Sequence, residues 1–430
     1  RGSVPDGITN SVSFATMTSN VIVWFRNDLR LSDNPALVKA VHTGNVLPIY
    51  IYDDANPKEA QPGSASRVWL HHSLKSLNKS LDNRLAFFKG DPLDLIPKLV
   101  AQYQISHVFW NRQYEPWAIA RDKLVKKCLK ESKLNVESHN GSLLWEPWNI
   151  NKADGTPYRV FTPFYRKGCL SSTEPRKPIP EPKNIKYIEH QERNALDEIG
   201  LLPQTPWHKS LLSHWKIGEK GAQKRLQNFI DNGISRYKEG RNFPSKPYVS
   251  YISPHLHFGE ISPNQAWHKA RDLPADSNVD HFCSELGWRE FSHNLLFHNP
   301  ELPKKNLQTK FDNFPWSTNR KLLKAWQRGL TGVPFVDAGM RQLWTTGTMH
   351  NRVRMVVGSF LVKNLLLDWR HGERWFWDCL FDADLANNSA GWQWVAGCGA
   401  DAAPYFRIFN PVTQGQKFDG AGTFIRQYIP

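Results

Sequence analysis

The N-terminal part of the chain alternates short apolar runs with longer amphipathic stretches. The runs are apolar on both faces and bounded by polar or turn residues, which is typical of buried parallel strands. Between them, residues 66–81 carry valine and leucine at helical spacing. This alternation predicts βαβ units, so we expect an α/β domain over residues 21–148, built on a doubly wound parallel sheet of five strands. The strand-like runs are residues 21–25, 46–52, 85–88 and 108–110.

After residue 207 the strand-like runs disappear and a helical period takes over. We therefore expect residues 207–430 to form an all-α domain. Residues 149–206 are interpreted as an interdomain linker, because prolines among charged residues favour an extended connector over 170–206. The polar residues 1–20 are interpreted as a disordered leader or tag remnant. The predicted helices are 219–232, 264–271, 282–296, 320–329, 334–346 and 351–369.

Charge, apolar content and cysteine usage limit the classes of function open to this protein. Lys and Arg total 55 against 40 Asp and Glu, a net charge of +15, which points to a polyanionic partner such as nucleic acid. No apolar run is long enough to span a membrane. The five cysteines are scattered without a C-x-x-C pair, which argues against a disulfide framework or a metal site and suggests the cytosol. The 18 tryptophans are an unusually large number.

The densest chemical signal lies at residues 381–394. Two aspartates, two asparagines and two tryptophans are interleaved there with small residues. Small residues let a flat ring approach the backbone, and the polar groups can bond the edge of a heteroaromatic ligand. The alternative is a capped helix start, with Asp382 or Asn387 as the N-cap and the tryptophans in the core.

Six motifs, taken together and in order, resemble the photolyase/cryptochrome family, and most closely the microbial cyclobutane pyrimidine dimer (CPD) photolyases. The resemblance runs from Val21 to Ile429. It implies a deoxyribodipyrimidine photolyase, in which excited, fully reduced FAD sends an electron to the dimer and receives it back. The motifs lie at residues 24–30, 253–263, 285–291, 347–355, 382–385 and 401–411.

Two functions from the same family compete with this interpretation. A cryptochrome-type photoreceptor would bind FAD but act through a protein partner. Asn388 disfavours it, because plant cryptochromes carry Asp at that position and animal ones Cys, and so does the end of the sequence at Pro430. A (6-4) photolyase would usually place a catalytic histidine where this chain has Asn351.

The resemblance implies a U-shaped FAD in the helical domain. Arg354 is the expected partner of Asp382, and Asn388 is expected to face flavin N5, where a neutral amide favours the reduced states. Val249 stands where the family usually has Thr, so one hydroxyl donor to the pyrophosphate is lost. The implied FAD-binding residues are Tyr237, Val249, Ser250, Tyr251, Ile252, Ser253, Arg289, Arg354, Asp382, Ala383, Asp384 and Asn388.

The resemblance also implies a pocket for a dimer flipped out of UV-damaged DNA; photolyases are a standard example of base flipping. For Glu285 the alternative is a helix-surface salt bridge to Arg289 four residues on. The implied catalytic residues are Glu285, Asn351, Trp288, Trp394, Met355 and Asn388. The implied DNA-binding residues are Arg241, Glu285, Trp288, Arg289, Asn351, Arg352 and Trp394.

Three tryptophans, Trp392, Trp369 and Trp316, match the family's electron-transfer chain from the surface to the flavin; the alternative is a core role. An antenna chromophore, methenyltetrahydrofolate or a deazaflavin, would lie against residues 111–118. Folate-binding relatives usually have Asn-Glu where this chain has Trp117 and Ala118, which disfavours folate. We expect a monomer in the bacterial cytosol.

Overall fold

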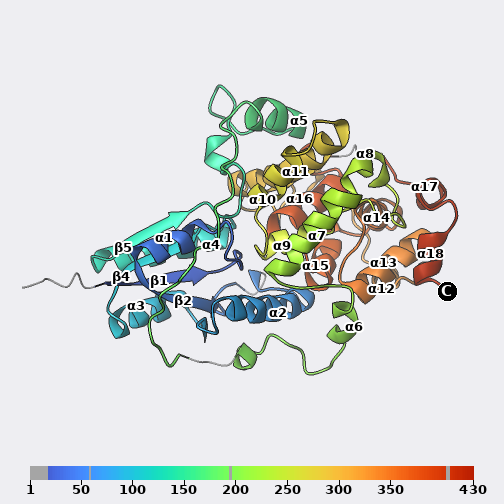
Figure 1. Ribbon diagram of the computed structural model, residues 1–430. Coiled ribbons are helices and arrows are strands. Elements are labelled where there is room, and N and C mark those ends of the chain that lie inside the picture. The colour runs from blue at the N-terminus through green and yellow to red at the C-terminus, as the bar shows by residue number, and fades with distance from the viewer. Residues whose placement is uncertain (1–17, 58–59, 193–195, 403–406) are drawn as a thin grey trace, which may run out of the picture.

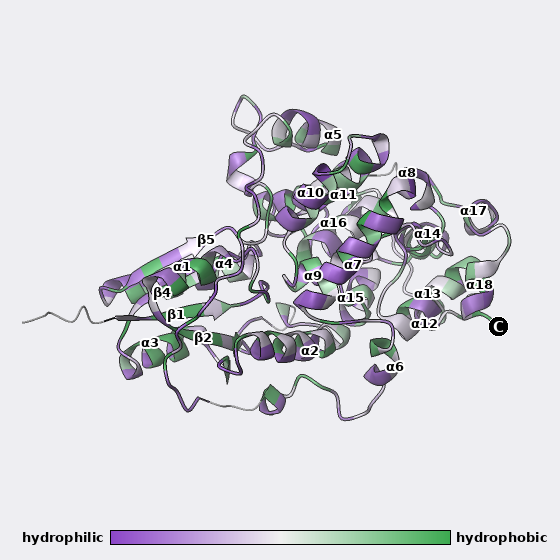
Figure 2. Ribbon diagram, viewed as in Figure 1, coloured by the Kyte–Doolittle hydropathy of each residue, from purple (hydrophilic) through white to green (hydrophobic). Residues whose placement is uncertain are grey.

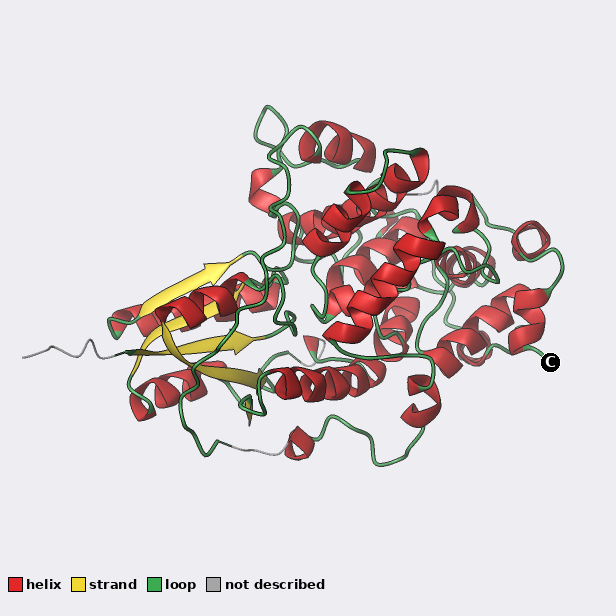
Figure 3. Ribbon diagram, in the orientation of Figure 1, coloured by secondary structure: helices red, strands yellow, loops and turns green. Residues whose placement is uncertain are grey.

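The computed structural model describes residues 18–57, 60–192, 196–402 and 407–430. An α/β part and a helical part lie side by side, with the strands confined to one side of the molecule (Figures 1 and 3). Most of the expected leader lies outside the described residues, and the first strand begins at Ser19. Residues 403–406 of the motif at 401–411 also lie outside them.

The sheet has five parallel strands in the order β3-β2-β1-β4-β5. This order confirms the predicted doubly wound sheet. Only the last strand has no apolar run in the sequence, because most of its residues are partly exposed. The strands are β1 (Ser19–Phe25), β2 (Gly44–Tyr52), β3 (Ala86–Lys89), β4 (Ile105–Asn111) and β5 (Asn135–His139).

Helices cover both faces of the sheet. Val21 and Val23 of β1 pack with α1 (Pro35–Thr43) and α2 (Ser64–Ser80). Ile22 and Trp24 face the opposite way and pack with α3 (Pro92–Gln102) and α4 (Pro116–Glu131). Because successive side chains point to opposite faces, a strand covered on both sides must be apolar throughout. Figure 2 shows β1 in the hydrophobic colour.

The helical part confirms the predicted all-α architecture, with one error. The expected helix at 351–369 is interrupted: α14 ends at Ser359, a π-helical turn covers Phe360–Asn364, and Leu366 adopts φ 54°. A new helix then starts where the Asp368 side chain caps it. The remaining helices are α6 (His208–Leu212), α7 (Glu219–Asn232), α8 (Tyr237–Gly240), α9 (Ser253–His257), α10 (Pro263–Arg271), α11 (Ser277–His298), α12 (Arg320–Arg328), α13 (Pro334–Thr346), α14 (Asn351–Ser359), α15 (Trp369–Cys379), α16 (Leu385–Ala396), α17 (Pro411–Phe418) and α18 (Thr423–Tyr428).

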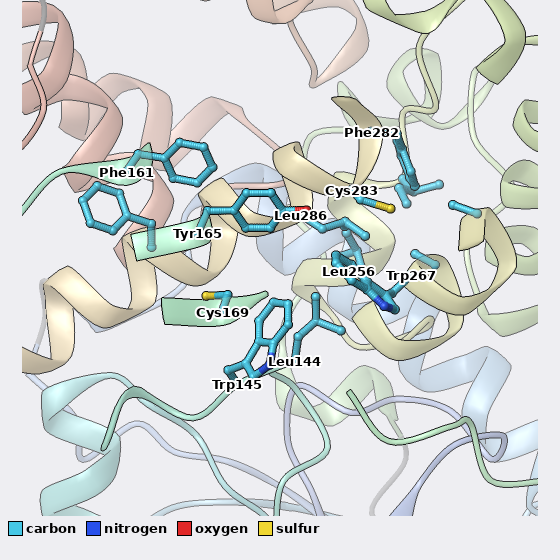
Figure 4. Packing of buried hydrophobic residues seen from close by; sticks show 14 of the residues in the cluster. Leu144, Trp145, Phe161, Tyr165, Cys169, Leu256, Trp267, Phe282, Cys283 and Leu286 are labelled. Carbon is cyan, nitrogen blue, oxygen red and sulfur yellow. The ribbon is translucent and has the colours of Figure 1, made fainter. Parts of the chain in front are cut away.

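The segment predicted as a linker has two different parts. Its beginning forms α5 (Phe161–Pro163) and a π-helical turn, Phe164–Cys169, which pack into the helical core (Figure 4). A Cβ at Gly287 of α11 would lie 2.6 Å from the Tyr165 ring, so glycine permits this close packing. The described residues of 170–192 and 196–206 then run largely as loop, and Tyr187 forms a parallel bridge with Val46 of β2.

Direct contacts join the two parts of the molecule. The Arg30 guanidinium, from the motif at residues 24–30, donates to the Gly259 carbonyl at 3.0 Å. From α2, the Trp69 indole Nε1 donates to Glu260 Oε1 at 3.2 Å. The first motif therefore docks the α/β part onto the segment that follows α9.

A buried carboxyl at the junction predicts a pH effect. Burial raises the pKa of Glu290 to about 7, against the opposing influence of Arg289 and of the backbone N–H groups of Leu144 and Trp145. Because the folded pKa exceeds the unfolded one, stability is lost as the pH rises from about 4.5 through 7. Glu290→Gln should remove this loss. Its free energy of unfolding should exceed that of the unaltered protein by about 3 kcal/mol at pH 8, and the two should be similar at pH 4.

Urea denaturation of Glu290→Gln at both pH values measures the effect. The exposed Glu181→Gln serves as the control variant, because its carboxyl is solvated in the folded state. An equal change at pH 4 and pH 8 would contradict the assignment of a buried carboxyl that ionises at a cost.

Candidate active site

One cavity of about 630 Å³ lies within the helical part. Its walls come from α8, the loop before α9, α11, α14 and α16. Trp369 and Trp316, two of the predicted electron-transfer residues, do not line it. The predicted site residues that do line it are Tyr237, Arg241, Val249, Ser250, Tyr251, Ile252, Ser253, Glu285, Trp288, Arg289, Asn351, Arg352, Arg354, Met355, Asp382, Ala383, Asp384, Asn388, Trp392 and Trp394.

Asp382 and Arg354 form the predicted pair. The Arg354 Nη2 lies 2.8 Å from Asp382 Oδ2, and Nη1 lies 3.2 Å from Oδ1. The Ser253 hydroxyl also donates to this carboxylate. Burial alone would raise the pKa of Asp382, but the charge and hydrogen bonds of Arg354 outweigh burial and hold this pKa below its usual value. The carboxylate is therefore a fixed, ionised acceptor.

The helix cap near this pair falls on a different residue from those expected. Asp384, rather than Asp382 or Asn387, is the N-cap of α16, and it accepts from the Asn387 backbone N–H at 2.9 Å. His293 Nε2 lies 4.0 Å from the Asp384 carboxylate. Asp382 is thereby left free of a capping role and is committed to Arg354.

Asn388 is buried and held in one orientation. Its Nδ2 donates to the Glu373 backbone carbonyl at 3.0 Å, so the amide oxygen is the group left to accept a hydrogen bond. The Glu373 side chain accepts from the Ser389 hydroxyl at 3.3 Å. Burial raises the pKa of Glu373 to about 8, so it is protonated at neutral pH. No negative charge from this side chain therefore lies beside Asn388.

The loop before α9 has strained backbone. Tyr251 adopts φ 51°, which is uncommon for a residue with a side chain. The Ser250 hydroxyl accepts from the Ile252 backbone N–H at 3.4 Å. Nearby in the cavity wall, Arg289 Nη1 is buried without a hydrogen bond among the described residues. This guanidinium nitrogen lies 4.0 Å from Glu290 Oε2 and still has a hydrogen bond to donate to an anion.

Glu285 has partners that the sequence analysis did not assign to it. Arg241 Nη1 donates to Glu285 Oε1 at 2.6 Å, and the same nitrogen lies 2.6 Å from His281 Nε2. The alternative salt bridge to Arg289 is not among the ion pairs of the described residues. Burial raises the pKa of Glu285, and Arg241 opposes this only in part. Arg241, predicted to bind DNA, thus holds Glu285.

The two predicted aromatic walls are themselves supported by aromatic rings. Trp288 stacks on Phe161 with ring centroids 4.0 Å apart and an interplanar angle of 13°. Trp394 stacks on Phe409 at 6.3 Å. Asn351 Nδ2 lies 4.0 Å from the Met355 sulfur, one helical turn away. The indoles are therefore oriented before any ligand binds.

The three predicted electron-transfer tryptophans differ in burial: Trp392 and Trp369 are buried and Trp316 is partly exposed. Trp392 lines the cavity, and its Nε1 has no hydrogen-bond partner in the described part of the chain. Trp369 is completely buried and donates from Nε1 to Asn306 Oδ1 at 2.9 Å. Trp316 is partly exposed, with its ring 4.4 Å from that of Phe314. All three belong to or pack against one core cluster.

The predicted antenna wall encloses little space. A cavity of only about 30 Å³ is lined by Arg112, Gln113, Tyr114 and Glu115. Arg112 forms a bidentate pair with Glu146 at 2.8 and 2.9 Å, so these side chains largely satisfy one another. An antenna chromophore remains a prediction of the sequence.

Three residues that contribute to the cavity or its support were missed. His350 lies in the motif at 347–355, but its importance depends on an unpaired ring nitrogen that the sequence does not show. Glu373 gave no signal, because its role depends on the packing of α15 against α16. Phe161 lies in the predicted linker, and a stack across more than a hundred residues cannot be read from local pattern.

The cavity residues fit FAD. The volume lies within the range of cofactor sites. A flat ring can pack beside Ala383 and the unpartnered Trp392 indole, and the ionised Asp382 and the Asn388 amide supply acceptors for its edge. Arg289, with a free N–H, can meet a phosphate.

Both parts of the chain are similar to known proteins. The FAD binding domain of DNA photolyase matches residues 282–430, and the DNA photolyase domain matches residues 21–183. The deoxyribodipyrimidine photo-lyase of Agrobacterium fabrum is 50% identical over 96% of this chain and 87% of its own length. Cryptochrome-2 of Arabidopsis thaliana is 36% identical over 96% of this chain and 71% of its own.

A solved structure is similar along nearly the whole chain. The bacterial class III photolyase from Agrobacterium tumefaciens has a TM-score of 0.93 and 48% sequence identity, covering 98% of this chain and 88% of that one. Among the residues described here, no helix combines the length and apolarity needed to cross a membrane.

Proposed function

Because this chain belongs to the photolyase/cryptochrome family, we propose that it repairs UV-damaged DNA by light-driven splitting of cyclobutane pyrimidine dimers. The observation that carries this proposal is that a single cavity gathers the residues suited to FAD and those suited to a flipped dimer. The greater likeness to the photo-lyase than to the cryptochrome favours repair over photoreception.

FAD, when bound and reduced, supplies the light-driven electron. The chain's own residues would hold it: Asp382, fixed by Arg354, would accept a hydrogen bond from the ring edge, and the Asn388 oxygen would accept one from the ring. A neutral amide does not compete for the proton there, so the reduced form is favoured. Arg289 and the loop at Val249–Ser253, with Tyr237 nearby, would hold the pyrophosphate.

The same cavity receives the dimer. Trp288 and Trp394 offer faces for stacking, which stabilises an unpaired base. Glu285, whose raised pKa eases proton sharing, and the exposed Asn351 amide bond the pyrimidine edges. Arg352 contributes positive charge for the backbone phosphates. The chain acts as a monomer in the bacterial cytosol.

A comparison of two lesions tests the proposal. Chemically reduced protein is illuminated with an oligonucleotide that carries one cyclobutane dimer or one (6-4) photoproduct. Loss of the cyclobutane dimer alone is expected, because Asn351 supplies no catalytic imidazole. Repair of only the (6-4) lesion would contradict the assignment.

Asn388→Cys should retain FAD but make its reduced form reoxidise in air about tenfold faster or more, because the acceptor amide is lost. The measurement is the decay of reduced-flavin absorbance after illumination stops. The exposed Asn232→Cys controls for an added thiol. An unchanged decay in Asn388→Cys would show that this amide does not face the flavin's reactive nitrogen.

Trp316→Phe should slow photoreduction of oxidised flavin by at least tenfold and spare repair by chemically reduced protein. Phenylalanine keeps the ring but is much harder to oxidise than indole. Trp207→Phe, at an indole that is 40% exposed, is the matched control. Equally fast photoreduction in Trp316→Phe would place the electron path elsewhere.

A further inference from the structure

One buried side chain in the cavity wall has no part in the roles assigned above. His350 immediately precedes α14, lines the cavity and is only 2% exposed. Its Nδ1 accepts a hydrogen bond from the Arg352 backbone N–H at 3.2 Å and so caps the helix. An acceptor nitrogen carries no proton, so the ring proton lies on Nε2. The cap therefore fixes both the tautomer and the orientation of the ring.

The opposite nitrogen of this ring is unsatisfied. His350 Nε2 is buried and has no hydrogen-bond partner in the described part of the chain. Buried donors nearly always have a partner, and leaving one unpaired is costly. The ring cannot turn to relieve this without releasing the helix cap. A ligand group that enters the cavity is the natural acceptor.

The surrounding charges indicate which kind of acceptor fits. Burial, followed by the charges of Arg241, Arg354 and Arg352, lowers the pKa of His350 to about 3, so the ring is neutral at physiological pH. Arg241 and Arg354 are each paired with a carboxylate. Within the described residues Arg352 forms no ion pair; it donates to the Asn242 amide oxygen at 2.6 Å and lies over the Phe418 ring.

A neutral N–H donor beside an arginine without an acidic partner suits a singly charged phosphate oxygen. A phosphate diester would satisfy the buried donor and balance the excess positive charge together. A neutral carbonyl would satisfy only the donor. A carboxylate side chain of the protein would also satisfy the donor and balance the positive charge, but none of the described carboxylates bonds to His350.

We propose that His350 Nε2 donates a hydrogen bond to a phosphate group bound in this cavity beside Arg352. This inference rests on the proposed function, because FAD and the dimer-containing strand each bring phosphates to the site. His350 is then a phosphate-binding residue that adds direction to the charge supplied by Arg352. Unlike the arginine, it contributes no charge of its own.

Two substitutions separate binding from capping. His350→Asn and His350→Asp both keep a good N-cap acceptor, but neither can donate as Nε2–H does. His350→Asp also places a negative charge where the phosphate would lie, while it pairs with Arg352 and maintains the fold. Thermal unfolding of the holoprotein at saturating FAD, monitored by far-UV circular dichroism, measures the stability that depends on the helix cap.

Binding is measured for two probes. One is the rate of FAD loss from diluted holoprotein, and the other is the affinity for an oligonucleotide that carries one cyclobutane dimer. For a phosphate from DNA, His350→Asn lowers oligonucleotide affinity about tenfold and leaves the rate of FAD loss unchanged; for the FAD pyrophosphate the pattern is reversed. In either case His350→Asp has the larger effect.

The salt dependence of oligonucleotide binding provides a control. Arg352→Gln should reduce the slope of log affinity against log salt by about one, because a charge is lost. His350→Asn should leave that slope unchanged, because the lost donor is neutral. A reduced slope in His350→Asn would contradict a neutral donor.

Two results would overturn the inference. The first is that both variants bind both probes as tightly as the unaltered protein does. If the unaltered protein repairs the dimer at the same time, the inference fails while the proposed function stands. The second is a loss of binding in His350→Asn that matches an equal fall in melting temperature, with His350→Asp behaving identically, because that pattern reports only the helix cap.

Discussion

Asp382→Ala is expected to abolish FAD binding and to destabilise the helical part by about 3–5 kcal/mol, the largest effect among these variants. Removing the carboxylate leaves the Arg354 guanidinium without its charged partner, and it also removes the acceptor of the Ser253 hydroxyl. Flavin absorbance of the purified protein and its urea denaturation midpoint measure the two effects.

A double variant separates the two effects of this change. Replacing a whole buried pair by apolar residues often restores stability, so Asp382→Leu with Arg354→Leu should regain much of the fold and still lack FAD. The exposed Asp272→Ala is the surface control. Retention of FAD by Asp382→Ala would contradict a direct role for this carboxylate in holding the ring.

Acid should weaken the same pair in the wild type. The folded pKa of Asp382 lies below its usual value, so the stability it contributes is present above about pH 4 and is lost as the pH falls through the folded pKa.

Glu285→Ala is expected to lower affinity for a dimer-containing oligonucleotide by about 10- to 100-fold while the flavin spectrum stays unchanged. The variant loses the group that bonds the pyrimidine edge and leaves Arg241 without its 2.6 Å partner. Affinity is measured by fluorescence anisotropy with damaged and undamaged strands. The exposed Glu301→Ala controls for loss of a negative charge.

A double-mutant cycle separates the two causes. If Glu285 serves mainly to hold Arg241, then adding Arg241→Ala should cost little further affinity. If Glu285 contacts the lesion itself, discrimination between damaged and undamaged strands should fall in both backgrounds. Wild-type discrimination in Glu285→Ala would contradict its proposed role.

Much of the fold could be predicted because single strands and helices carry their own pattern. β1 is covered on both faces, so its apolar run was unambiguous, whereas most residues of β5 are partly exposed and it shows no such run. The break after Ser359 was missed because the apolar spacing continues through it, and the left-handed Leu366 leaves no signal in a non-glycine residue.

The site could be predicted as a set of residues but not as a set of contacts. Motif resemblance identified residues that one cavity brings together. Pairings across distant helices, such as Arg241 with Glu285 or Phe161 with Trp288, depend on packing that local sequence does not encode. His350 was overlooked because its significance comes from an unpaired nitrogen, which only coordinates reveal.

The central claim is that this chain uses light to split cyclobutane dimers without net redox change. The most direct measurement follows pyrimidine absorbance of a dimer-containing oligonucleotide with chemically reduced protein, under blue light and in the dark, while flavin absorbance is recorded. We predict that pyrimidine absorbance returns only under light and that the flavin stays reduced. No return of pyrimidine absorbance under light, with reduced flavin bound, would contradict the account.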